Sequence, residues 1–139
     1  MLVKVFAVFL LMFLCVQGMT LTLLGKPSDT PRTINIDAVT QKCYNIYNCF
    51  KGPNISATWQ GVKRNTNVVF YNNPSCQTRH AVGSGTPDGV LYFSDAKFDK
   101  TVKAFMIWET GTYATNGVLD ACYLDESATV NSTAESFAV

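Results

Sequence analysis

Cysteine spacing is the feature that most constrains how this chain can fold. Of its five cysteines, Cys15 lies in an apolar N-terminal segment, and the other four lie between residues 43 and 122. An even number of cysteines in a short exported chain indicates a framework of two disulfides. We predict that these bonds involve Cys43, Cys49, Cys76 and Cys122.

The N-terminal segment has the pattern of a secretion signal. Lys4 supplies a positive charge, and residues 5–16 form an apolar run of twelve residues. Such a run suits a signal peptide, whereas a membrane span needs about 20 residues. We therefore predict a signal peptide over residues 1–18 with cleavage after Gly18, and a later cut after Gly25 as the alternative. The mature protein is expected to be secreted and extracellular, with no membrane span.

The net charge of the mature chain indicates which classes of partner it can bind. Removal of Lys4 with the signal leaves ten basic and ten acidic residues, so the mature net charge is zero. A neutral chain is not built to hold nucleic acid or anionic lipid by bulk electrostatics. We expect a monomer whose partner is an extracellular protein or glycan, and no nucleic acid partner.

Local composition divides the mature chain into three parts. Residues 19–39 contain Pro27, Pro31 and several turn formers, which predicts an extended leader without a helix or central strand. Residues 125–139 are acidic and rich in serine and threonine, which predicts a disordered tail. The folded domain is expected over residues 40–124.

Residues 40–124 have the pattern of a β protein. Short runs of β-branched and aromatic residues occur at 68–71, 90–93 and 101–108, and turn-forming residues separate them. Strands at such short intervals indicate a sandwich or a barrel. The fold class is therefore predicted to be all-β.

Two conformations of residues 43–49 predict different disulfide pairings. If the segment is extended, Cys43 and Cys49 lie about 20 Å apart, and each must bond to Cys76 or Cys122. If residues 45–48 form a turn, Cys43 and Cys49 can bond to each other. Two asparagines within the segment favour the turn. We therefore prefer Cys43–Cys49 with Cys76–Cys122, and the extended alternative stays open.

The sequence offers little catalytic chemistry. His80 is the single histidine, which excludes a multi-histidine zinc site, and it is interpreted as a loop residue. We expect no enzyme, no catalytic residues, no metal ion and no cofactor. A small hydrolase is the alternative, because carboxylate pairs can act as acid and base. Its candidates are Asp88, Asp95, Asp99, Glu109 and Asp120.

Two further patterns suggest surface features. Asn54 and Asn131 each begin an Asn-x-Ser/Thr acceptor for N-linked glycan. Trp59 and Tyr113 are the ligand-binding candidates, because aromatic side chains can form a sugar-binding platform. Burial in the core is the competing interpretation for both aromatic residues.

Two segments resemble each other and, together, a known fold. Residues 49–61 and 98–111 each place an aromatic residue before a turn, followed by an aliphatic residue, alanine and tryptophan. With residues 68–71, this arrangement resembles the βγ-crystallin-like fold, in which two Greek-key motifs form a small sandwich. It looks most like small secreted cysteine-bearing members of plant-pathogenic water moulds and some microbial toxins. The resemblance covers about residues 43–122. The calcium motif of that family keeps only Ser56, so we expect no tight calcium site.

These features predict a disulfide-stabilised Greek-key β-sandwich. The primary functional hypothesis is a secreted, non-enzymatic effector or binding module that acts through its surface on a host or competitor molecule. A carbohydrate-binding, lectin-like module is the first alternative, and the small hydrolase is the second.

Overall fold

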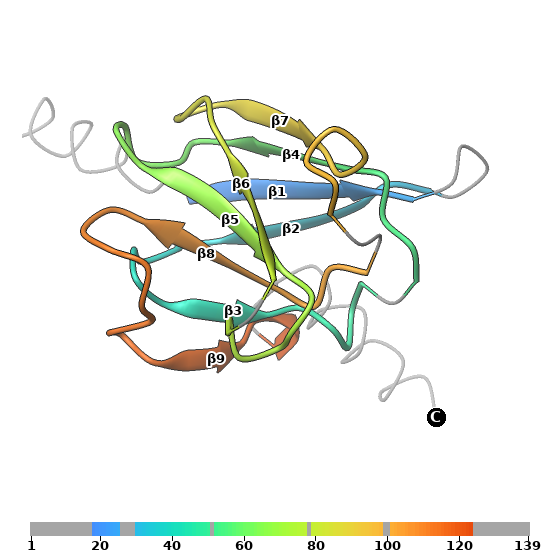
Figure 1. Cartoon of the computed structure of the whole chain (residues 1–139). Coiled ribbons are helices and arrows are strands. Elements are labelled where there is room, and N and C mark those ends of the chain that lie inside the picture. Colours follow the sequence, from blue (N-terminus) through green and yellow to red (C-terminus); the bar gives the residue numbers. More distant parts are fainter. Residues whose placement is uncertain (1–17, 26–29, 51, 78, 99–100, 124–139) are drawn as a thin grey trace, which may run out of the picture.

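The described part of the chain consists of strands and connecting loops. The computed structural model describes residues 18–25, 30–50, 52–77, 79–98 and 101–123. Within these ranges, nine β-strands and one short 3₁₀ turn form two sheets that face each other (Figure 1). None of the described residues forms a helix that is long and apolar enough to cross a membrane. The predicted all-β class and the two sheets of a sandwich are confirmed for these residues.

The four-stranded sheet has the order β2-β1-β4-β7, and all its neighbours are antiparallel. Its strands are β1 (Met19–Leu24), β2 (Arg32–Ile36), β4 (Ser56–Gln60) and β7 (Gly89–Tyr92). Along β1, apolar Met19, Leu21 and Leu23 are buried, while the threonines between them are partly exposed. This period of two is what a strand with one buried face requires.

The five-stranded sheet has the order β6-β5-β8-β3-β9. Its strands are β3 (Cys43–Asn45), β5 (Asn67–Tyr71), β6 (His80–Gly83), β8 (Ala104–Trp108) and β9 (Val118–Asp120), and the 3₁₀ turn η1 (Ala121–Tyr123) follows. The pairing of β3 with β9 is parallel, and the other pairings are antiparallel.

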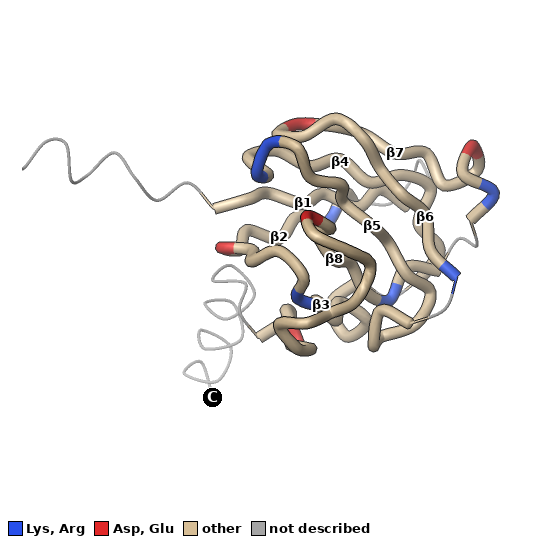
Figure 2. Tube along the Cα trace, turned by 60° about the vertical axis from the view of Figure 1, so that its left-hand side comes forward, with Lys and Arg blue, Asp and Glu red and all other residues tan. Residues whose placement is uncertain are grey.

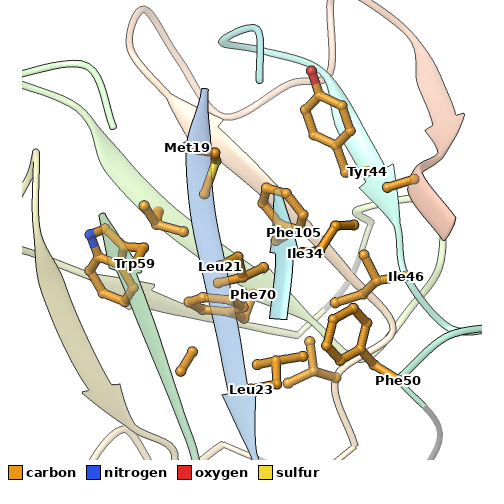
Figure 3. Packing of buried hydrophobic residues seen from close by; sticks show 14 of the residues in the cluster. Met19, Leu21, Leu23, Ile34, Tyr44, Ile46, Phe50, Trp59, Phe70 and Phe105 are labelled. Carbon is orange, nitrogen blue, oxygen red and sulfur yellow. The ribbon is translucent and has the colours of Figure 1, made fainter. Parts of the chain in front are cut away.

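Large apolar side chains from both sheets fill the space between them (Figure 3). Leu21 and Trp59 come from the four-stranded sheet, and Phe70 and Phe105 from the five-stranded one; all four are fully buried. The Phe105 ring stacks on Tyr44 with 5.1 Å between ring centroids. Each large apolar side chain buried in this way contributes about 1.5–3 kcal/mol of stability.

The five-stranded sheet is also covered on its outer face. Met106 and Val69 are fully buried there, next to Cys43, Cys76 and Tyr71. The loop that follows β5 carries Cys76 onto this face. The sheet therefore has two buried sides, which agrees with the near-continuous apolar run Ala104–Trp108.

The prediction of an extended leader over residues 19–39 is wrong. Residues 19–24 form β1, which lies between β2 and β4 and pairs with both, and residues 32–36 form β2. The turn-forming residues of this segment fall between the two strands, and Pro31 immediately precedes β2. Among the described residues, the first strand thus begins at Met19. The predicted signal peptide, apart from Gly18, and the predicted tail lie outside the described residues.

The preferred disulfide pairing is also wrong. The bonds are Cys43–Cys76 and Cys49–Cys122, with Cα atoms 5.7 Å and 5.5 Å apart. A turn does precede Cys49, since the N–H groups of Cys49 and Phe50 both donate to the Ile46 carbonyl. Cys43, however, lies in strand β3 before that turn begins. The observed pairing is the kind that the extended alternative required, with each cysteine bonded to Cys76 or Cys122, although residues 47–49 form a turn.

The two segments that resemble each other occupy different sheets. Trp59 lies in β4 of the four-stranded sheet, and Trp108 lies in β8 of the five-stranded sheet. Trp59 is fully buried, whereas Trp108 is partly exposed on the outer face. The two tryptophans therefore have different structural roles.

Candidate functional site

Trp59 is a core residue, so its prediction as a ligand-binding aromatic is wrong. Its indole has no exposed surface and contacts Phe70, with 6.0 Å between ring centroids. A Cβ added to Gly83 or Gly89 would come within 2.4 or 2.5 Å of this indole. Two glycines thus create the space that the ring fills. The β-pattern alone could not show which face of the strand the ring occupies.

Tyr113 is exposed, as a binding residue requires, and its loop is firmly held. Its side chain is 80% exposed. The buried amide of Gln41 donates to the carbonyls of Gly111 and Tyr113, and accepts from the N–H groups of Glu109 and Thr110. All these bonds fix the loop backbone beneath the tyrosine. The ring itself projects into solvent.

The candidate carboxylates of a hydrolase have different partners. Asp88 accepts from the Gly61 N–H, and Asp120 accepts from Asn48 and from the Cys122 N–H. Glu109 binds Lys63 and Thr40, and these hydrogen bonds lower the pKa of its carboxyl. An acid catalyst needs a raised pKa, so the shift of Glu109 has the opposite direction. Asp99 lies outside the described residues, and Asp95 lies in the turn after β7.

His80 lies on the outer face of the five-stranded sheet. Its ring lies against Trp108 and Tyr71, with centroid separations of 5.1 and 5.6 Å. The Trp108 Nε1–H donates to the Tyr71 hydroxyl over 2.9 Å. The histidine is in strand β6 and not in a loop, so that interpretation is corrected. Its visible role is to cover the outer apolar cluster.

The predicted glycan acceptor Asn54 is buried. Only 6% of its surface is exposed, and its Nδ2 donates to the Gly52 carbonyl over 3.3 Å. Ser56 of the same motif is buried in β4. Both residues of this motif are therefore buried in the folded chain. Asn131 lies outside the described residues.

The outer face of the four-stranded sheet carries hydroxyl and amide side chains together with the apolar Leu24 and Val90 and the aromatic Tyr92. The register of the strands aligns its side chains in three rows across the sheet. We call this surface the polar face. Its rows are Asn35–Thr20–Gln60, Thr33–Thr22–Thr58–Val90 and Leu24–Ser56–Tyr92.

None of the residues in the polar face is charged. Strands β1, β4 and β7 contain no Lys, Arg, Asp or Glu, and Figure 2 shows them without coloured segments. The one charged residue of β2 is Arg32, which pairs with the buried Leu23 and donates to the Cys49 carbonyl. A partner that binds the polar face therefore meets hydrogen-bonding and apolar groups there, and no charged side chain.

Hydrogen bonds between neighbouring strands order the polar face. Thr20 donates to Asn35 over 2.8 Å, and the hydroxyls of Thr22 and Thr33 lie 2.9 Å apart. These cross-strand pairs restrict side-chain rotamers before any partner arrives. The adjacent Thr58 is exposed. Its hydroxyl lies in the same row and can both donate and accept.

The two ends of the polar face differ. At the Thr20 end, a hollow of about 490 Å³ is lined by Gly18, Thr20, Gln60, Gly61 and Asp88. At the other end, Tyr92 is 52% exposed, and Ser56 separates it from Leu24. The face therefore runs from a polar hollow with a carboxylate to an exposed aromatic ring.

Sequence reasoning missed the polar face because two of its strands lie in the supposed leader. The signal was the alternation Met19-Thr-Leu-Thr-Leu23, with Ile34 and Ile36 repeating it in β2. The threonines of this alternation form the solvent side of a strand.

Comparisons with known proteins identify no relative. The chain matches no family model, no curated protein and no solved structure.

Proposed function

We propose that this chain is a secreted, non-enzymatic binding module that acts through the polar face. The observation that carries the proposal is the ordered, uncharged surface formed by β2, β1, β4 and β7. Exposed hydroxyls and amides that are already positioned lose little conformational entropy on binding. Such a surface suits recognition better than chemistry, which requires groups whose protonation is tuned.

The export pattern and the disulfides support an extracellular site of action. Disulfides form and persist in oxidising compartments, and this chain has two interleaved bonds, Cys43–Cys76 and Cys49–Cys122. We infer that the signal peptide directs the protein out of the cell, where it meets a host or competitor molecule. Relation to the crystallin-like Greek-key proteins is part of this proposal.

The binding role is tested by placing one charge on the polar face. Thr58→Lys puts an ammonium group in the middle row, and we expect it to abolish capture of the partner from extracellular fluid of the target organism. Asn67→Lys is the matched control, because Asn67 is an exposed polar strand residue of the other sheet. Equal capture by both variants and the unmodified chain would contradict the proposed surface.

A further inference from the structure

We infer that the polar face binds a neutral glycan chain, an inference that rests on the proposed binding function. The ligand class follows from three properties of the face: its absence of charge, its mixture of donors and acceptors, and its aromatic end.

The absence of charged side chains from the polar face argues against an anionic ligand. An anionic polysaccharide or phosphate-bearing lipid is held by Lys and Arg, and the three rows of the polar face contain neither. Asp88, a carboxylate at its border, lines the hollow and would repel an anion. A neutral partner meets no such cost.

The hydrogen-bonding groups match a polyol. Threonine hydroxyls donate and accept, and the amides of Asn35 and Gln60 offer one acceptor and two donors each. Glycan hydroxyls also donate and accept, so they can pair with the donors and acceptors that the internal bonds leave available; Thr20, for example, donates to Asn35 and can still accept. Asp88 can accept from a hydroxyl in the hollow while it keeps its bond to the Gly61 N–H.

The aromatic end suits the apolar side of a sugar ring. Tyr92 is half exposed on the edge strand β7, with Val90 exposed on the same strand. An aromatic ring packs well against the C–H face of a pyranose, while the neighbouring hydroxyls bind its edge. Protein partners, by contrast, are usually anchored by several aromatic or Arg side chains in a buried centre.

The length of the face indicates an oligosaccharide. Its three rows are separated by two residues along β1, from Thr20 through Thr22 to Leu24. Two such steps span about 13 Å at 3.3 Å per residue. A ligand that reaches from the hollow to Tyr92 therefore contains several sugar units.

Affinity electrophoresis of the secreted chain tests this inference. Gels would contain β-1,3-glucan, hydroxyethylcellulose, xylan or galactomannan as neutral polymers, and polygalacturonate or heparin as anionic ones. We expect retardation by at least one neutral polymer. Tyr92→Ala and Thr58→Val should each weaken it by about tenfold, the effect of one lost contact, and Asn67→Lys should leave it unchanged.

The outcomes separate the ligand class from the binding role. Retardation by anionic polymers alone would overturn the neutral ligand. No retardation by any polymer, with capture of a protein that Thr58→Lys abolishes, would also overturn it but leave the proposed function standing. No effect of any polar-face variant on either assay would remove both. Thr58→Val preserves shape and β-branching, so its loss of binding cannot be assigned to misfolding when its melting temperature is unchanged.

Discussion

Replacing Trp59 by alanine separates a core residue from a binding residue. Trp59 and Tyr113 are the two aromatic ligand candidates of the sequence, and the structure gives them opposite environments: 0% and 80% exposed. If Trp59 holds the two sheets together, Trp59→Ala must lower stability whether or not a ligand is present. Tyr113→Ala must leave stability almost unchanged.

The size of the effect follows from what the indole contacts. Truncation of a fully buried tryptophan to alanine costs about 3–5 kcal/mol. The bond from Nε1 to the Gly85 carbonyl is lost as well, 3.2 Å in length, and leaves a carbonyl without that donor. A small domain has roughly 5–15 kcal/mol of total stability. At about 4 kcal/mol, Trp59→Ala should lower the melting temperature by roughly 20 °C.

Urea unfolding monitored by far-ultraviolet circular dichroism measures this loss with the disulfides intact. With a slope of about 2 kcal/mol per M, the midpoint should fall by about 2 M for Trp59→Ala, and by less than about 0.3 M for Tyr113→Ala. Gly89→Ala provides a second route, because its Cβ would lie 2.5 Å from Trp59 and 2.6 Å from the Gly85 carbonyl. A midpoint unchanged by Trp59→Ala would refute the placement of this ring in the core.

Three further predictions concern covalent structure and pH. Peptide mapping should recover only Cys43–Cys76 and Cys49–Cys122; a Cys43–Cys49 peptide would contradict the fold. N-terminal sequencing of the secreted protein should begin at Met19, because a cut after Gly25 would remove the central strand β1; a start at Lys26 would refute this. Burial raises the pKa of Tyr44 and Tyr71 above the ordinary value of 10. The stability that these neutral hydroxyls contribute is therefore fully present below pH 10, and it is lost as pH rises through their pKa values in the folded chain. As pH rises above 10, the urea midpoint of Tyr71→Phe should fall less steeply than that of the unmodified chain. An equal fall in the two proteins would count against the raised pKa of Tyr71.

The strands that sequence reasoning found are those with strong local signals. Residues 68–71 and 90–93 combine β-branched and aromatic residues with turn formers at their ends, and they correspond to β5 and β7. Residues 101–108 contain β8, which begins three residues later than predicted, at Ala104. Where burial on one or both faces dictates residue type, the pattern is visible in the sequence.

The disulfide pairing could not be obtained in that way. The turn after Ile46 was predicted correctly, but the pairing depends on which strand faces Cys43 across the sheet. The residues around Cys43 in the folded chain are far from it in sequence. Cys43 lies opposite Met106, and the loop after β5 brings Cys76 to Cys43. Sheet order is a non-local property, which local propensity does not determine.

The candidate site was missed for a related reason. A polar sheet face contains no conspicuous motif, because threonine, asparagine and glutamine are ordinary surface residues. Their meaning arises only when strand order places Thr33 beside Thr22 and Thr58. The two strands that supply most of these groups lie in the segment that prolines and turn formers made resemble a leader. The same segment completes both the core, through Leu21 and Ile34, and the polar face. Substitutions on the outer side of β1 should therefore change binding while leaving the fold intact, whereas substitutions on its inner side should unfold the sandwich.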